Sequence, residues 1–154
     1  MKIALKYGLL ITLCIIAWVV IAHWLVPNPQ SRVHSLGPLV FFNLVEVLGI
    51  YYGLKARRSA SPGEMTFKDG VKTGVAIAAV YAISSCLFFL IGIFVVGAKM
   101  LNAEQGAQVK PMWQVAALAY AGLFFGSLFF GLIYSTVISF FIARRLPRGS
   151  SEII

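Results

Sequence analysis

Charged residues are scarce in this chain. Of its 154 residues, 12% are Asp, Glu, Lys or Arg and only 5 are acidic, whereas 60% are hydrophobic. A soluble domain carries about a quarter charged residues, and a chain this short cannot bury so much apolar surface in one core. The scarcity of charge therefore excludes a water-soluble globular domain and a disordered chain. It leaves an integral membrane protein.

Catalytic and metal-binding patterns are also missing. The sequence has no GxSxG, HExxH, P-loop or Rossmann glycine pattern. Cys14 and Cys86 lie in apolar segments without a CxxC partner, and His23 and His34 have no ligand-type residue at helical spacing. We therefore expect a non-enzymatic protein without a cofactor or metal. The two histidines are interpreted as interfacial side chains, and a paired-histidine haem or metal site is the less favoured alternative.

Long apolar runs dominate what is present. A helix needs about 20 apolar residues to cross a bilayer, and four runs meet that length: residues 5–26, 36–54, 70–97 and 112–143. They predict an all-α fold, a polytopic transmembrane four-helix bundle that forms a single membrane domain over residues 1–154. The first run is longer than the apolar core of a signal peptide, about 7–15 residues, so we expect it to be an uncleaved helix.

The entry to the third helix carries a capping pattern. Thr66 and Asp69 have the T-x-x-D spacing of a capping box. In this motif the Thr hydroxyl accepts a free N–H of the first helical turn, and the acidic side chain reaches back toward the Thr. The spacing therefore predicts a defined helix start at this point.

The positive charges predict the orientation. All but three of the 13 Lys and Arg residues lie in the N-terminal tail, the segment between the second and third runs, or the C-terminal tail; the exceptions are Arg32, Lys99 and Lys110. Cytoplasmic segments of membrane proteins are enriched in Lys and Arg. We therefore expect a multi-pass protein of the bacterial inner (cytoplasmic) membrane with both termini in the cytoplasm.

The net charge of +8 is also explained by a membrane rather than by a soluble partner. The basic residues flank apolar runs and are not interleaved with aromatic residues, so we expect no nucleic-acid partner. Each Lys or Arg near an anionic membrane surface contributes about 1 kcal/mol of binding. The residues expected to contact anionic lipid headgroups are Lys55, Arg57, Arg58, Arg144 and Arg145.

Glu46 is the candidate functional residue. It lies near the middle of the second run, where an ionised carboxylate costs at least about 2.5 kcal/mol. Neighbours on its helical face and serines at similar depth on other helices complete a predicted intramembrane polar site, which comprises Glu46, Asn43, Ser84, Ser85 and Ser127. One interpretation is a protonated carboxyl, hydrogen-bonded to Asn43 or the serines, that fixes helix packing. The alternative is a proton or cation site in a small transporter or channel.

Glycine pairs at a spacing of four residues predict close helix contacts. The pairs are Gly49 with Gly53, on the face of Glu46, and Gly122 with Gly126. A GxxxG spacing lets another backbone approach closely, either within one chain or between chains. Together with the missing catalytic groups, these pairs favour an accessory or assembly subunit that binds other membrane proteins or itself. A small transporter or channel that uses Glu46 is the alternative.

Three short motifs carry a resemblance to a known family. They are ALKYG at residues 4–8, GIYYGLK at residues 49–55 and TFKDG at residues 66–70. In order and spacing they resemble a bacterial family of small four-helix membrane proteins catalogued as domain of unknown function 4199. The likeness spans nearly the whole chain. It implies a four-helix inner-membrane protein, and it implies no established activity or catalytic residue.

Overall fold

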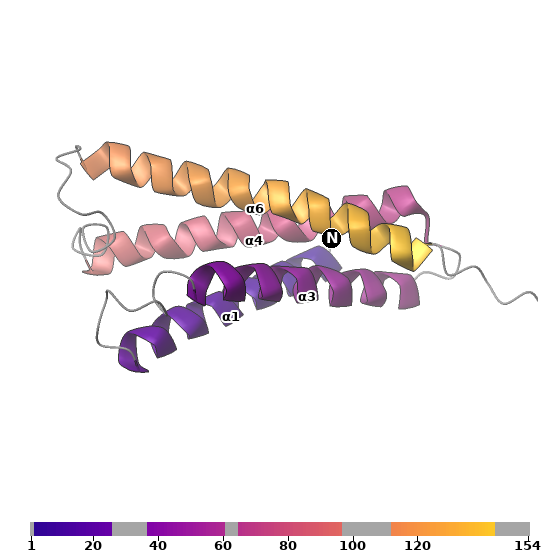
Figure 1. Ribbon diagram of the computed structural model, residues 1–154, viewed down its shortest axis with the longest axis horizontal. Helices are drawn as coiled ribbons and strands as arrows, with labels where there is room; N and C mark the ends of the chain where they lie inside the picture. The colour runs from indigo at the N-terminus through magenta and orange to yellow at the C-terminus, as the bar shows by residue number, and fades with distance from the viewer. Residues whose placement is uncertain (1, 26–36, 61–64, 97–111, 144–154) are drawn as a thin grey trace, which may run out of the picture.

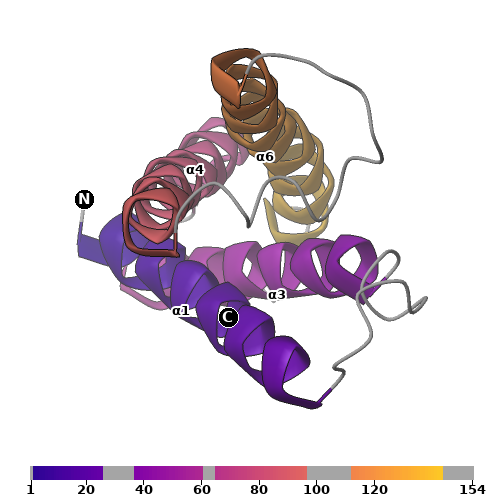
Figure 2. The ribbon, with the colours of Figure 1, turned by 90° about the vertical axis from the view of Figure 1, so that its left-hand side faces the viewer.

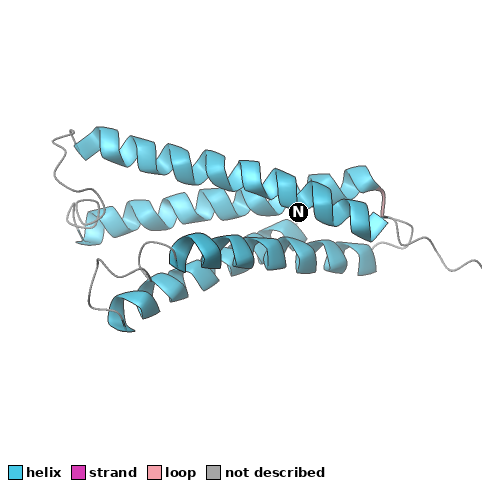
Figure 3. Cartoon of the chain, viewed as in Figure 1, coloured by secondary structure: helices cyan, strands magenta, loops and turns pink. Residues whose placement is uncertain are grey.

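Four helices make up the described part of the fold (Figure 1). The computed structural model describes residues 2–25, 37–60, 65–96 and 112–143. Its helices are α1 (Lys2–Leu25), α3 (Gly37–Ser59), α4 (Phe67–Val96) and α6 (Met112–Ala143). The described residues contain no strand (Figure 3). Each helix is long and apolar enough to cross a membrane. The predicted all-α transmembrane four-helix bundle is therefore confirmed.

The helix ends differ from the predicted ones where polar residues continue a helix. Helix α3 continues to Ser59 rather than ending at Leu54, and α4 begins at Phe67 rather than at residue 70. Lys, Ala and Arg are good helix formers, and basic side chains are favourable in the last turn of a helix. The amide of Ala60 still donates to the carbonyl of Ala56 at 3.1 Å. Apolarity sets the span in the membrane, but it does not set where a helix ends.

The start of α4 is capped as its sequence predicts. The hydroxyl oxygen of Thr66 accepts the backbone N–H of Asp69 at 3.2 Å, and the hydroxyl donates to Oδ2 of Asp69 at 2.6 Å. The Asp side chain therefore reaches back to the Thr hydroxyl rather than to its amide. The two bonds fix the residue at which the helix begins.

The helices form a bundle that is wider at one end. Helix α4 packs most closely with α6, α3 contacts the three other helices, and α1 and α6 lie at opposite corners (Figure 2). In Figure 1, α1 and α6 diverge toward the left-hand side. We call this the wide end; its helix termini are Leu25, Gly37, Val96 and Met112. The opposite end is the narrow end.

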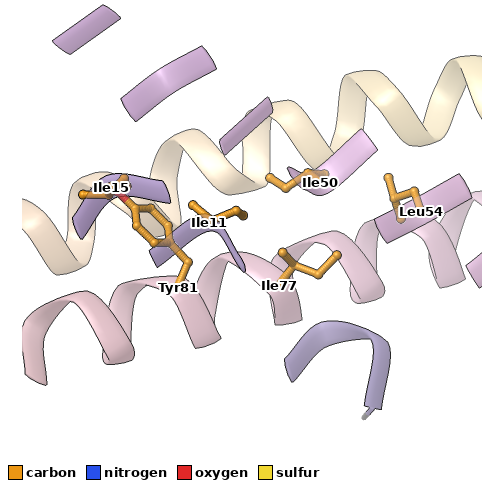
Figure 4. Packing of buried hydrophobic residues seen from close by; sticks show 6 residues of the cluster. All are labelled: Ile11, Ile15, Ile50, Leu54, Ile77 and Tyr81. Atoms are coloured by element: carbon orange, nitrogen blue, oxygen red, sulfur yellow. The ribbon is translucent and has the colours of Figure 1, made fainter. Parts of the chain in front are cut away.

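The apolar core is small and is made mainly of isoleucine. Six side chains from α1, α3 and α4 form it: Ile11, Ile15, Ile50, Leu54, Ile77 and Tyr81 (Figure 4). Ile11, Ile50, Leu54 and Ile77 lie between the middle of the bundle and the narrow end. Farther toward the wide end, Trp18 of α1 stacks on Phe41 of α3 with ring centroids 4.4 Å apart.

The outer surface is apolar, as lipid requires. Trp24, Trp113 and Phe125 are 81%, 69% and 67% exposed, whereas several small polar side chains are buried, among them Thr12 and Ser135. Lipid tails are as apolar as leucine, so large hydrophobic side chains gain little from leaving them. Close packing and internal hydrogen bonds hold such a bundle together instead.

The α4–α6 contact is a match of two small-residue stripes. Over several turns of each helix, from Gly70 to Ala82 on α4 and from Ser127 to Ser139 on α6, every fourth residue is Gly, Ala or Ser. The helices run antiparallel, so a step of four along α4 meets a step of four back along α6. From the narrow end, the facing pairs are Gly70 with Ser139, Gly74 with Ser135, and Ala78 with Gly131. All six residues are buried. The short side chains let the two backbones approach closely over several turns.

Filling this contact should destabilise the bundle. A Cβ on Gly74 would overlap the side chain of Ser135, so we expect Gly74→Val to lower the free energy of unfolding in mild detergent by about 1–3 kcal/mol, the usual cost of overpacking. Gly122→Val is the matched control, because nothing described lies within 4 Å of a Cβ at Gly122. Thermal unfolding of both variants measures the difference. Equal losses would contradict the stripe contact.

Candidate intramembrane polar site

Glu46 lies in the interior of the bundle, on the side of α3 that faces α6. Its side chain is only 4% exposed. A Cβ added to Gly131 of α6 would lie 3.1 Å from Oε1 of Glu46, so the missing side chain of Gly131 leaves room for the carboxyl. Oε1 is buried and has no hydrogen-bond partner among the described residues. The site therefore holds a carboxyl oxygen whose hydrogen-bonding capacity is unused.

Two tyrosines flank Glu46. Tyr81 of α4 and Tyr134 of α6 both lie close enough to interact with it electrostatically. Tyr81 is 3% exposed, and its hydroxyl is hydrogen-bonded to Ser127. The hydroxyl of Tyr134 donates to Oδ1 of Asn43 at 2.6 Å. A buried tyrosine hydroxyl usually finds a partner, and here the two rings engage Ser127 and Asn43.

The two serines of α4 take different positions. The Ser84 hydroxyl lies 2.6 Å from the Thr12 hydroxyl of α1 and 2.7 Å from the carbonyl of Val80. The Thr12 hydroxyl oxygen also lies 3.1 Å from the carbonyl of Gly8. Each hydroxyl has one proton, so one of the two donates to the other across the helices while the other donates to a carbonyl of its own helix. Ser84 therefore joins α1 to α4. Ser85 is 1% exposed, and its Oγ has no partner among the described residues.

At Oε1, Glu46 therefore makes none of the expected hydrogen bonds with the polar neighbours that the structure describes. Asn43 donates to the carbonyl of Leu39 at 2.6 Å and accepts from Tyr134, so it is already engaged on both sides. The sequence did place these groups at one depth, but depth does not set the direction of a side chain. Tyr81 and Tyr134 are the site residues that sequence reasoning missed. The sequence could have indicated them, because each is a tyrosine, with a hydroxyl that needs a hydrogen-bond partner, inside a long apolar run.

The glycine pairs divide into two kinds. Gly49 faces Ile11 and Gly53 faces Ile77 and Tyr7, with no space for a Cβ at either, so this pair lies in close helix contacts. Gly122 and Gly126 have nothing described within 4 Å of a Cβ, so they make no such contact inside the described bundle. Successive residues of a helix are rotated by about 100°. Gly126 therefore points away from the α4-facing stripe that begins at Ser127.

Arg58, one of the basic residues expected to contact lipid headgroups, makes a hydrogen bond to another helix of the bundle. Nη1 of Arg58 donates to the carbonyl of Ile142 at 3.1 Å, so α3 caps the last turn of α6. Lys55 and Arg57 are exposed near the same end. Arg144, Arg145 and His34, as well as the side chain of His23, lie outside the described residues.

The described residues hold no group of three or more His, Cys, Asp or Glu side chains that could bind a metal ion. Cys14 and Cys86 are free thiols on α1 and α4. Among the described residues, the polar groups of the bundle interior are thus one carboxyl, the phenols of Tyr81, Tyr120 and Tyr134, several hydroxyls and the two thiols.

Comparison with known proteins identifies a family. The family described as Protein of unknown function (DUF4199) matches residues 6–144. The chain belongs to this family. The match extends from α1 to the residue after α6, so the four helices and the polar site all lie within the DUF4199 region. No curated protein and no solved structure matches the chain.

Replacing Glu46 should test whether it supports the fold. An apolar side chain removes a buried oxygen that has no described partner, so we expect Glu46→Leu to be at least as stable as wild type in detergent. Asn43→Leu is the control, because it leaves the Tyr134 hydroxyl without its acceptor and should cost about 1–3 kcal/mol. Thermal unfolding compares the two. A loss for Glu46→Leu as large as that for Asn43→Leu would show that Glu46 is a structural hydrogen-bonder.

Proposed function

We propose that this member of the family is a non-enzymatic accessory or assembly subunit of the bacterial inner membrane. It binds a transmembrane helix of another membrane protein on the outward face of α6. The observation that supports this role is the open space at Gly122 and Gly126.

These two glycines differ from the others whose surroundings are known. Gly8, Gly49 and Gly74 each have a side chain of another helix where a Cβ would be. In such a place glycine permits a contact that offsets its cost, which is about 1 kcal/mol per residue relative to alanine in a helix. At Gly122 and Gly126 the described chain supplies no such contact. A helix from outside the chain would supply it.

The side chains around this pair suit a helix. Leu118 and Phe125 are 64% and 67% exposed on the same half of α6, and Ala121 is exposed beside Gly122. Two glycines four residues apart, bordered by large apolar side chains, form a shallow surface into which the side chains of a second helix pack. We call this surface, formed by Leu118, Ala121, Gly122, Phe125 and Gly126, the α6 outer face.

The absence of enzymatic activity is part of the proposal. The intramembrane acid, Glu46, is 4% exposed, whereas a general acid or base must come within hydrogen-bond reach of its substrate. The sequence supplies no nucleophile–base pattern beside it. Both features favour a binding role over a catalytic one.

Bulky substitutions on the α6 outer face test the binding role. We expect Gly122→Leu combined with Gly126→Leu to leave the bundle folded and to remove a membrane protein that co-purifies with the wild-type chain in mild detergent. The physical reason is that leucine side chains hold the two helix backbones apart. Quantitative mass spectrometry of the purified complexes, together with size-exclusion chromatography, gives the measurement.

Thr136→Leu is the matched control, because Thr136 is exposed on α6 outside this surface. It should keep the partner. A partner recovered equally with all variants would contradict the proposal. A wild-type chain that purifies alone, or only as a homo-oligomer disrupted by the leucines, would replace the foreign partner with a second copy.

The proposed location places both termini in the cytoplasm, because the second connecting segment and both tails carry most of the Lys and Arg. Reporter fusions after Ala60 and after Arg148 should both report the cytoplasm, and a fusion between Ala98 and Lys110 should report the opposite side. The narrow end would then face the cytoplasm, where the Arg58 side chain contacts the end of α6. Opposite reports from these two fusion sites would refute the two spans, α4 and α6, that lie between them, and an even number of spans overall would be refuted if the two tails reported opposite sides.

A further inference from the structure

We propose that the first turns of α4 carry a binding site for one anionic phospholipid, in which a shallow apolar groove takes an acyl chain while Lys68 and Lys72 bind the phosphate. This inference is independent of the binding role of α6. It rests on the residues that line the groove, on the spacing and charge of the two lysines, and on the length of the helix.

A shallow groove lies on the surface of α4 near the narrow end of the bundle. The residues that line it are Phe67, Lys68, Val71, Lys72 and Val75. Val71 and Val75 are half-buried and form its floor, and Phe67, which is 44% exposed, borders it at the start of the helix. The stems of the two lysines are apolar, and only their ends are charged. This lining suits a ligand that joins a hydrocarbon chain to an acidic headgroup.

The two lysines of the groove lie one turn apart on the same side of α4. Both are exposed. Like charges four residues apart on a helix repel each other. Helical side chains lean toward the N-terminus of their helix, so the ammonium group of Lys72 extends toward the turn that holds Lys68. A phosphate between the two ammonium groups removes the repulsion and accepts a charge-assisted hydrogen bond from each.

Among the described residues, the acidic neighbour of the lysine pair is Asp69, and it does not neutralise the pair. Its carboxyl accepts a hydrogen bond from the Thr66 hydroxyl at 2.6 Å and interacts electrostatically with Arg57 of α3 as well as with Lys72. One carboxylate is thus shared between two cations, and the groove keeps a net positive charge. A zwitterionic headgroup would bring an ammonium group of its own, and an apolar helix would leave both lysines without a counter-charge. Charge complementarity therefore favours an anionic phospholipid as the occupant.

The length of α4 places the groove at the depth that a phospholipid requires. The 30 residues of this helix give it a length of about 45 Å at 1.5 Å per residue, whereas the hydrocarbon core of a bilayer is about 30 Å thick. The end turns of α4 therefore lie at the level of the lipid headgroups. The lysines are in these turns, and Val75 lies farther toward the hydrocarbon. The phosphate and the acyl chain of a phospholipid would thus meet groups of matching polarity in the correct order.

Lipid binding to the full chain in mild detergent tests the site. We expect native mass spectrometry to show a retained molecule of phosphatidylglycerol, and we expect added phosphatidylglycerol to raise the temperature of thermal unfolding, because a ligand that binds the folded state stabilises it. Phosphatidylcholine with the same acyl chains should have neither effect. Glycerol phosphate, which has the phosphate but no chain, should also have neither effect at the same concentration. An equal effect of phosphatidylcholine would contradict the role of the lysines, and an equal effect of glycerol phosphate would contradict the role of the groove.

Matched charge changes locate the phosphate. Lys68→Gln combined with Lys72→Gln should weaken phosphatidylglycerol binding roughly 25-fold, because each lysine near an anionic headgroup contributes about fivefold. Lys2→Gln combined with Lys6→Gln is the matched control. These two lysines are also exposed, four residues apart and at the narrow end, but they do not line the groove, so this variant should bind as the wild type does. Equal losses in the two double variants, or no loss in the first, would overturn the proposal.

A change in the apolar lining tests the groove separately from the charge. Phe67→Ala removes one border of the groove and keeps both lysines, so we expect it to weaken phosphatidylglycerol binding severalfold in the same measurement. Leu5→Ala is the control, because Leu5 is 55% exposed on α1 and lies outside the groove. Unchanged binding by Phe67→Ala, or an equal loss in Leu5→Ala, would show that no acyl chain lies in this groove.

Discussion

The close contact between α4 and α6 is the constraint on which the rest of the structure depends. Gly70, Gly74 and Ala78 on one helix and Gly131, Ser135 and Ser139 on the other allow the backbones to approach over several turns. In lipid, helices do not gain from hiding large apolar side chains, so this kind of contact is the main source of attraction between them. The same contact places Gly131 opposite Glu46. The residue that brings the two helices together thus also makes the space for the carboxyl.

The polar groups of the interior follow from this arrangement. With α4 and α6 fixed, Tyr81 binds Ser127 across their interface and Tyr134 reaches Asn43 on α3. Thr12 and Ser84 then attach α1 to the other side of α4. The pairs α1–α4, α3–α6 and α4–α6 therefore each have one or two hydrogen bonds that set their register, while the carboxyl of Glu46 keeps an oxygen without a described partner. A side chain that contributes nothing to register is free to serve another purpose.

Much of the fold is predictable from the sequence because it depends on one helix at a time. The four apolar runs give the spans, and Thr66 with Asp69 gives the start of α4. The last turn of α3 is not predictable from apolarity, because the helix continues through the polar residues Lys55, Arg57 and Arg58. The neighbours of Glu46 depend on the rotation of each helix about its axis, which only packing sets. The same is true of Gly122 and Gly126, whose spacing resembles that of Gly49 and Gly53 but whose direction is opposite.

The bond from Arg58 to the carbonyl of Ile142 has a mechanical consequence. It joins the last turns of α3 and α6, two helices that are not consecutive in the chain, and it lies at the end where the bundle is narrow. Because this bond lies at the narrow end, a change in the angle between α3 and α6 at Arg58 would displace the other ends of the two helices most, about 30 Å away along α3 at 1.5 Å per residue. The outward-facing glycines of α6, Gly122 and Gly126, lie toward that far end.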